Sequence, residues 1–132
     1  MAQASVVTDQ VFEARIAKKL KLRKVELTAL VLVAQNEGLT AAQLAVALAF
    51  TPANMAAWID RLVRAGLVDR ERHLNDGRAL HIRTTAEGRA LVERATKEIS
   101  EGEAQALSGL THVERLMLME LLHKVAACRL TR

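Results

Sequence analysis

The sequence has few aromatic residues and almost no cysteine or proline. Its 132 residues include one Trp, two Phe, no Tyr, one Cys and one Pro. A core with so few rings must be built from Leu, Val, Ile, Ala and Met, a mixture that favours packed helices over a β-sandwich. The single Cys128 excludes an internal disulfide and a zinc site of several cysteines, and it suits a reducing cytosol. We interpret Cys128 as a small, semi-buried apolar residue rather than a redox-sensing thiol.

Long apolar runs are missing too. No run of about 18 apolar residues occurs, so we expect no transmembrane helix. The first ten residues lack the basic and apolar segments of a secretory signal, so we expect a cytoplasmic protein without a membrane partner. The 51% apolar and 26% charged residues are typical of a folded chain, and the length suits one domain spanning residues 1–132.

The patterns that mark enzymes and metal sites are also missing. The sequence has no Gly-rich phosphate loop, nucleophile elbow or pair of acids, so we expect no catalysis and no cofactor. The histidines are scattered without zinc-ligand spacing, which argues against a metal site: His73, His81, His112 and His123. The net charge of +4 permits a polyanionic partner without requiring one.

Apolar residues at helical spacing predict a first helix from Thr8 to Leu20, capped by Thr8 or Asp9. A basic cluster follows, which is either a solvated face or a set of phosphate contacts: Lys18, Lys19, Lys21, Arg23 and Lys24. A second helix is expected from about Val25 to Asn36, ending before Gly38. Its buried stripe is expected to be Leu27, Leu30, Val31 and Ala34.

The next two helices are short and joined by a tight turn. Thr40 and Gln43 form a capping box for the third helix, whose inward residues are Leu44, Ala45 and Leu48. The fourth begins at Thr51-Pro52, with proline at the first helical position, and ends at Ala65-Gly66. At 100° per residue, one of its sides carries Met55, Trp58, Ile59, Leu62 and Val63, and the other carries Ala53, Ala57, Asp60 and Arg64. We interpret Trp58 as core filling.

Two extended runs around Asp76-Gly77 predict a β-hairpin rich in arginine. A long helix follows from Thr85 or Ala86 to about Ala106, and Ser108-Gly109 interrupts it. A capping box of Thr111 and Glu114 opens a last helix that is apolar around much of its circumference. Such a helix needs cover from more than one side.

The order of these elements predicts a winged helix-turn-helix that binds double-stranded DNA. The second helix of the pair can enter the major groove, and an arginine of the hairpin, preferably Arg78, can reach the minor groove. From about Val25 to Val125 the chain also resembles the MarR family of winged-helix transcription regulators. The resemblance is carried by DRL at 60–62, AGLVDR at 65–70, DGRA at 76–79, Thr84 or Thr85 with Gly88, and LTxxE at 110–114.

This resemblance implies a mostly α fold with a β-hairpin wing. It implies a DNA-binding lobe at about 25–88 and dimerisation helices at about 8–24 and 89–130, which suits the apolar last helix. It also implies an obligate homodimer on a pseudo-palindromic operator, acting as a repressor that a small-molecule inducer relieves. The implied DNA contacts are Thr40, Thr51, Pro52, Ala53, Asn54, Ala57, Arg61, Arg72, Asn75, Asp76 and Arg78.

Some residues depart from the family pattern. Ala49 occupies a turn position where glycine is common, at a cost of about 1 kcal/mol if its φ is positive. Ala53, Ala56 and Ala57 occupy the reading face, where polar or basic residues are common, and Gly77 replaces an arginine of the wing. Alanine contacts a thymine methyl but cannot pair with a base edge, so Asn54 is the best base reader. The alternative is therefore a MarR-like dimer that mainly binds a small molecule or a protein, with weak DNA specificity.

Overall fold

The computed structural model describes residues 2–72 and 79–128. In chain order the elements are α1 (Ala2–Phe12), the π-helix η1 (Glu13–Ala17), α2 (Lys18–Leu20), α3 (Lys24–Gln35), β1 (Leu39–Thr40), α4 (Ala41–Leu48), α5 (Pro52–Arg64), β2 (Val68–Arg72), β3 (Leu80–Thr84), α6 (Ala86–Ala106) and α7 (His112–Ala127). The expected fold class, a mostly α chain with a winged helix-turn-helix, is confirmed.

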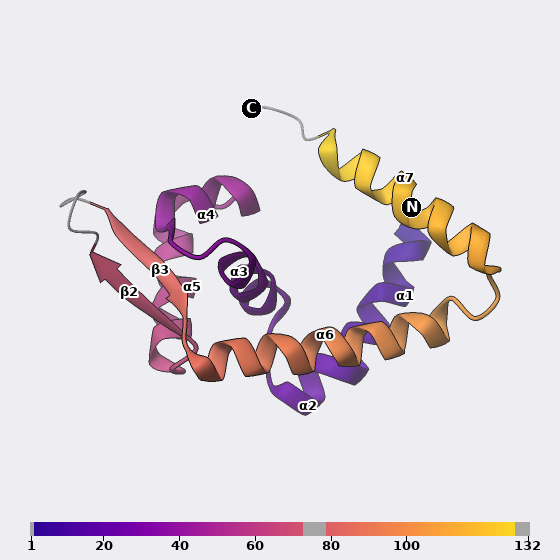
Figure 1. The fold of residues 1–132 in the computed structure, drawn as a ribbon, viewed down its shortest axis with the longest axis horizontal. Coiled ribbons are helices and arrows are strands. Elements are labelled where there is room, and N and C mark those ends of the chain that lie inside the picture. Colours follow the sequence, from indigo (N-terminus) through magenta and orange to yellow (C-terminus); the bar gives the residue numbers. More distant parts are fainter. Residues whose placement is uncertain (1, 73–78, 129–132) are drawn as a thin grey trace.

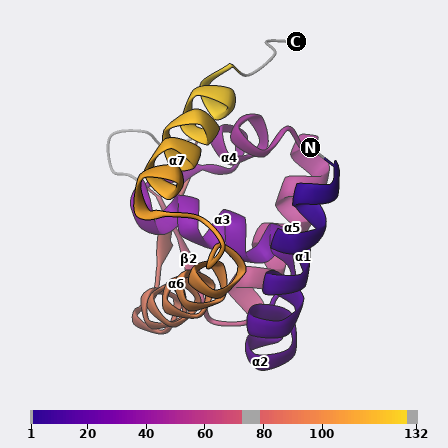
Figure 2. The same cartoon turned by 90° about the vertical axis from the view of Figure 1, so that its right-hand side faces the viewer.

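The molecule has a lobe at one end and a pair of helical arms at the other. Helices α3, α4 and α5 and the sheet form the lobe, and α6 runs from the sheet to the far end (Figure 1). The arms α1 and α7 rise from that far end, and the view along the molecule shows their tips on different sides (Figure 2). Helix α6 therefore joins the lobe to the arms.

Threonine side chains cap the helices of the lobe and of the C-terminal half. Both predicted capping boxes are present, and in the first, the Thr40 hydroxyl accepts from the Gln43 N–H at 3.2 Å while the Gln43 side chain accepts from the Thr40 N–H at 2.9 Å. Thr51 and Thr85 cap α5 and α6 through their hydroxyls alone, which accept from the N–H groups of Asn54 and Gly88. These caps satisfy N–H groups that the first turn of a helix leaves without a partner.

The first helix differs from its prediction. It begins at Ala2, so Thr8 and Asp9 lie inside it, and the Thr8 hydroxyl donates to the Ser5 carbonyl at 2.9 Å instead of capping. One turn further on, η1 widens the helix to a π-turn. Apolar spacing cannot reveal this turn because it depends on where Ile16, which is fully buried, meets the rest of the fold.

Helix α3 is the central helix of the lobe, because it contacts α4, α5, β3 and α6. Leu27 and Leu30 are buried as predicted, whereas Val31 and Ala34 are only half-buried and Ala29 and Val33 take the buried positions. The prediction was wrong for Val31 and Ala34, because a helix with neighbours on several sides has no single inward face.

The wing belongs to a three-stranded antiparallel sheet in the order β1-β3-β2. The two predicted strands pair from Val68 opposite Thr84 to Arg72 opposite Leu80. The short strand β1 was not predicted, since two residues are too few to show an alternating pattern. It pairs Leu39 with Ile82 and so ties the start of α4 to the wing.

Two backbone features fix the geometry of the lobe. Ala49 has a φ of 56°, the left-handed conformation expected of the turn between α4 and α5. At the start of α6, a Cβ on Gly88 would collide with the carbonyl oxygen of Leu67, the residue before β2, so only glycine lets the helix approach this closely. The Thr85 hydroxyl also donates to the Gly66 carbonyl at 2.6 Å, which joins the wing to α6 at the same place.

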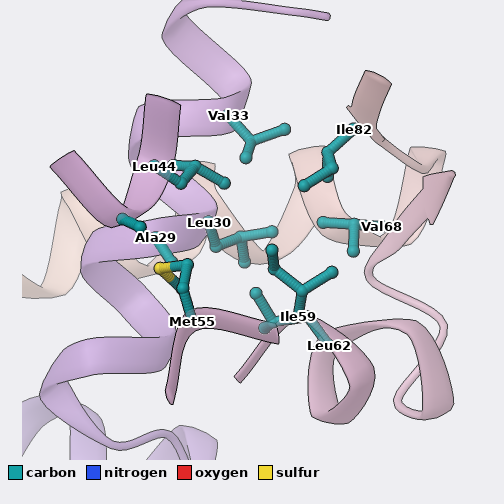
Figure 3. Packing of buried hydrophobic residues seen from close by; sticks show 10 residues of the cluster. Ala29, Leu30, Val33, Leu44, Met55, Ile59, Leu62, Val68 and Ile82 are labelled. Atoms are coloured by element: carbon teal, nitrogen blue, oxygen red, sulfur yellow. The ribbon is translucent and has the colours of Figure 1, made fainter. Parts of the chain in front are cut away.

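The core of the lobe lies between α3, α4, α5 and the sheet (Figure 3). Leu30, Leu44, Met55, Ile59 and Ile82 lie within it, each at most 1% exposed. A second cluster joins the N-terminal segment to α3 and α6 through Ile16, Leu22, Leu27 and Ala95. The fully buried residues of both clusters include no aromatic side chain, and Phe12, Phe50 and Trp58 pack against them only partly buried.

Burial and helix length bear on two further expectations. Cys128 is exposed just after α7, so the semi-buried position expected for it was wrong. In the described segments, no single helix is long and apolar enough to cross a membrane, and only α4 and α5 taken together, bent by 112°, meet that test.

Candidate nucleic-acid interface

Helices α4 and α5 form a helix-turn-helix pair. Their axes differ by 112° across the turn at Ala49 and Phe50, within the range of about 90–120° for this motif. Thr51 caps α5 by accepting from the Asn54 N–H at 3.3 Å, and Pro52 takes the first helical position. Thr51, Pro52, Ala53 and Asn54 at the start of α5 are exposed, as the second helix of such a pair requires.

The two sides of α5 lie as predicted. Met55, Ile59 and Leu62 are buried in the lobe core. On the opposite side Ala53 and Ala57 are exposed. Arg64 is exposed on the same side at the end of the helix, and the exposed flanks add Asn54, Ala56 and Arg61. Among the described residues of this face, the N-terminal half carries methyl groups and one amide, whereas the charges lie further along the helix.

Trp58 connects two arginines that are distant in sequence. The Arg61 guanidinium lies 5.1 Å from the centroid of the indole ring and the Arg23 guanidinium 6.0 Å, both within the range of cation–π attraction. Trp58 is half-buried against the lobe core, so its prediction as core filling is confirmed in part, and it also holds these two cations. Sequence reasoning missed this role of Arg23 because α3 and α5 meet only in the folded lobe.

Other members of the basic cluster have carboxylate partners. Lys19 contacts Glu98 of α6 at 3.1 Å, and Lys24 forms an ion pair with Asp9. Lys19 therefore attaches the N-terminal segment to α6, and Lys24 attaches α3 to α1, whereas Arg23 lies beside α5.

Asp60 joins α5 to the wing. Its carboxylate forms an ion pair with Arg70 of β2. The hydrogen bond from Arg70 lowers the pKa of Asp60 below its ordinary value of 3.8, against a smaller opposing effect of desolvation, and the charges of Arg70 and Arg64 lower it further. The only carboxylate of α5 is therefore neutralised by an arginine.

One predicted DNA contact lies at the base of the wing. Arg72 is exposed at the end of β2, and near it Arg83 and Glu71 form an ion pair of 2.6 Å across the two strands. The remaining predicted wing contacts, Asn75, Asp76 and Arg78, lie outside the described residues. Thr40 is half-buried and acts as the cap of α4 on the same lobe.

A pocket of about 280 Å³ lies where the lobe meets the arms. Its walls come from α1, α3 and α6 and include Lys24, whose ammonium lies 5.8 Å from the ring of Phe12 and forms the ion pair with Asp9. The lining residues are Thr8, Val11, Phe12, Lys24, Leu27, Thr28, Ile99 and Glu103. Across residues 2–72 and 79–128, no three His, Cys, Asp or Glu side chains are grouped so as to hold a metal ion.

The amino-acid sequence is similar to those of known regulators. A sequence model of the MarR family matches residues 22–80. An HTH-type transcriptional repressor of Mycobacterium tuberculosis, Rv2887, is 32% identical over 102 residues, which are 77% of this chain and 73% of the repressor. The corresponding repressor of Mycobacterium bovis matches to the same extent.

The fold is similar to those of solved regulators as well. A crystal structure of Rv2887 in complex with salicylic acid has a TM-score of 0.72 at 31% identity, covering 92% of this chain and 89% of that one. A probable transcriptional regulator of Pseudomonas aeruginosa has a TM-score of 0.79 at 27% identity, covering 94% of this chain and 92% of that one. The helix-turn-helix, the wing and these similarities agree, and the chain belongs to the MarR family of transcriptional regulators.

Proposed function

We propose that the protein is a homodimeric repressor of the cytoplasm that binds a pseudo-palindromic operator and leaves it when a small molecule binds. The observation that carries the proposal is the exposed N-terminal half of α5, flanked by the arginines at Trp58 and by the wing. An uncovered helix face with cations along its edge suits a major groove between two phosphate backbones.

The arms support the homodimer. Helix α7 has no buried residue, and Val113, Leu116, Met117, Met119, Leu121, Leu122 and Val125 are each 53–63% exposed. An apolar helix this exposed needs a partner, and a second copy of the chain would cover it by two-fold symmetry. Two copies would then present two α5 helices, which must lie about 34–36 Å apart to meet successive major grooves.

The pocket at α1, α3 and α6 supports control by a small molecule. The solved complexes of Rv2887 with salicylic acid and with p-aminosalicylic acid suggest an aromatic acid as the ligand class. In this chain Lys24 would supply the cation for the carboxylate by exchanging its partner Asp9 for the ligand, and Phe12 and Leu27 would supply the apolar walls. Because the walls come from both lobe and arms, a bound ligand would change the angle between them.

Selection of bound duplexes from a random pool, followed by a salt titration, tests DNA binding. The selected duplex should be an inverted repeat. Its binding constant should fall steeply with salt, because each phosphate contact releases a counterion. Replacing Arg61 or Arg72 by Ala should make the negative slope of log K against log salt less steep by about 2 per dimer, one contact in each half.

A matched control is Lys97→Ala, which removes one positive charge from an exposed position of α6. It should leave the slope unchanged. Intact dimers that bind no duplex even at low salt would contradict the proposal and favour the alternative, a dimer that binds small molecules or proteins.

A further inference from the structure

The exposed face of α5 begins with methyl groups rather than hydrogen-bonding groups. Ala53 and Ala57 are four residues apart and both exposed on the side opposite the core. Asn54 is the only polar side chain in the first turn after the cap. The N-terminal residues of the second helix lie nearest the base edges in this class of lobe, so these small side chains decide what the helix can read.

We propose that Ala53 and Ala57 recognise the 5-methyl groups of pyrimidines in the major groove, and that the half-site therefore carries thymines at fixed positions. This inference rests on the proposed function, since it requires α5 to enter the groove. In this groove thymine differs from uracil by an apolar methyl group alone, and from cytosine by that methyl group and by an acceptor in place of a donor; an alanine methyl can cover the methyl group. Asn54 beside them is suited to an adenine.

The spacing of the alanines limits where the methyl groups lie. Cβ atoms four residues apart on a helix are about 5–6 Å from each other. Successive base pairs rise by about 3.4 Å along each strand. The two methyl groups should therefore lie within three successive base pairs, on neighbouring or alternate steps.

The charged side chains of α5 either have a partner within the lobe or lie at the far end of the helix from Ala53. Asp60 is held by Arg70, and Arg61 lies over the ring of Trp58. Arg64 is at the last position of the helix, away from the first turn. The cations therefore supply attraction to any duplex, while the alanines supply discrimination between duplexes.

A double-mutant cycle between protein and DNA tests the contact. Deoxyuridine is substituted for each thymine of the selected duplex, which removes the methyl and keeps the base pair. Burial of one methyl group corresponds to a change of about fourfold in affinity, or about tenfold to twentyfold when both half-sites are substituted. The penalty should disappear at one position in Ala53→Gly and at another in Ala57→Gly.

The control variant Ala90→Gly makes the same change at an exposed position of α6 and should keep both penalties. A second arm replaces the sensitive T·A pair by C·G, with and without a 5-methyl group on the cytosine. The methyl should restore about fourfold of affinity per half-site in the parent and none in the matching glycine variant.

Equal affinity for thymine and deoxyuridine at every position would overturn the inference, as would a penalty that survives in both glycine variants of α5. In either case the proposed function stands, because the parent still binds the selected duplex. A parent that selects no duplex overturns both.

Discussion

The ion pair between Asp60 and Arg70 places a carboxylate on a helix expected to face a polyanion. Left alone, that carboxylate would repel phosphates, and Arg70 of the wing strand cancels its charge. The pair also joins α5 to β2, so the angle of the wing relative to the helix depends on it. The side chains of Asp60 and Arg70 are 46% and 35% exposed, so the contribution of this ion pair to the free energy of unfolding depends on pH and salt.

The lowered pKa of Asp60 predicts how stability changes in acid. The unfolded chain takes up the proton near the ordinary value of 3.8, whereas the folded chain takes it up at a lower pH. The contribution of the pair is therefore complete above that value and is lost as the pH falls through the folded pKa. Asp60→Asn should lose less stability than the parent between about pH 5 and pH 2.

Urea unfolding at one fixed protein concentration measures this difference, since the stability of a dimer depends on concentration. Asp69→Asn, on the same strand as Arg70, serves as the control and should follow the parent. A variant Asp60→Asn with the same acid loss as the parent would show that the pair contributes nothing measurable.

At this scale the sequence was informative where the interaction is local. A threonine three residues before an amide or carboxylate side chain determines a cap by itself, and Thr40 and Thr111 form the boxes as predicted. The partners of Arg70 and Arg23 could not be predicted, because Asp60 and Trp58 lie on another element and their distance depends on how the elements pack.

Among the elements, α7 has the most incomplete packing. Its apolar side chains surround the helix, and Met119 and Leu122 line a groove shared with Val7 of α1. Leu122→Glu should therefore convert the dimer to a monomer or to a weak dimer at micromolar concentrations, since a buried unpaired carboxylate is costly. Sedimentation velocity measures the change in mass.

Thr96→Glu adds the same charge to an exposed position of α6 and should leave the dimer intact. If Leu122→Glu sediments as a full dimer, the surface that joins the two copies does not include this part of α7.

The elements were predictable to differing degrees. Helices α4, α5, α6 and α7 have caps or glycines at their ends, and their bounds follow from those residues. The start of α1, the π-turn and β1 have no capping residue or glycine that predicts them, because their positions depend on how the arms and the sheet pack. The tip of the wing, with Asn75, Asp76 and Arg78, stays a prediction.

At the scale of the whole molecule, the proposed control by a small molecule depends on the distance between the two lobes of the dimer. A ligand in the pocket at α1, α3 and α6 should move each lobe as a rigid body and so change the separation of the two α5 helices. Salicylate, as the probe, should shift the distribution of distances between spin labels at Arg64→Cys in a Cys128→Ser background, measured by pulsed electron resonance.

The far-ultraviolet circular dichroism should stay unchanged, since neither lobe unfolds. Replacing Lys24 by Met should remove the effect of salicylate on the distances. Identical distributions for the free, salicylate-bound and DNA-bound dimer would contradict control by lobe separation.

The stack of Arg23, Trp58 and Arg61 also gives the molecule an optical property. With one Trp and no Tyr in the sequence, the fluorescence excited near the red edge of protein absorption comes from a single indole on the flank of α5. Anything that draws either guanidinium away from the ring changes the emission of that indole and of nothing else. The protein therefore carries its own reporter at the place where a duplex would meet it, and titrations need no added dye.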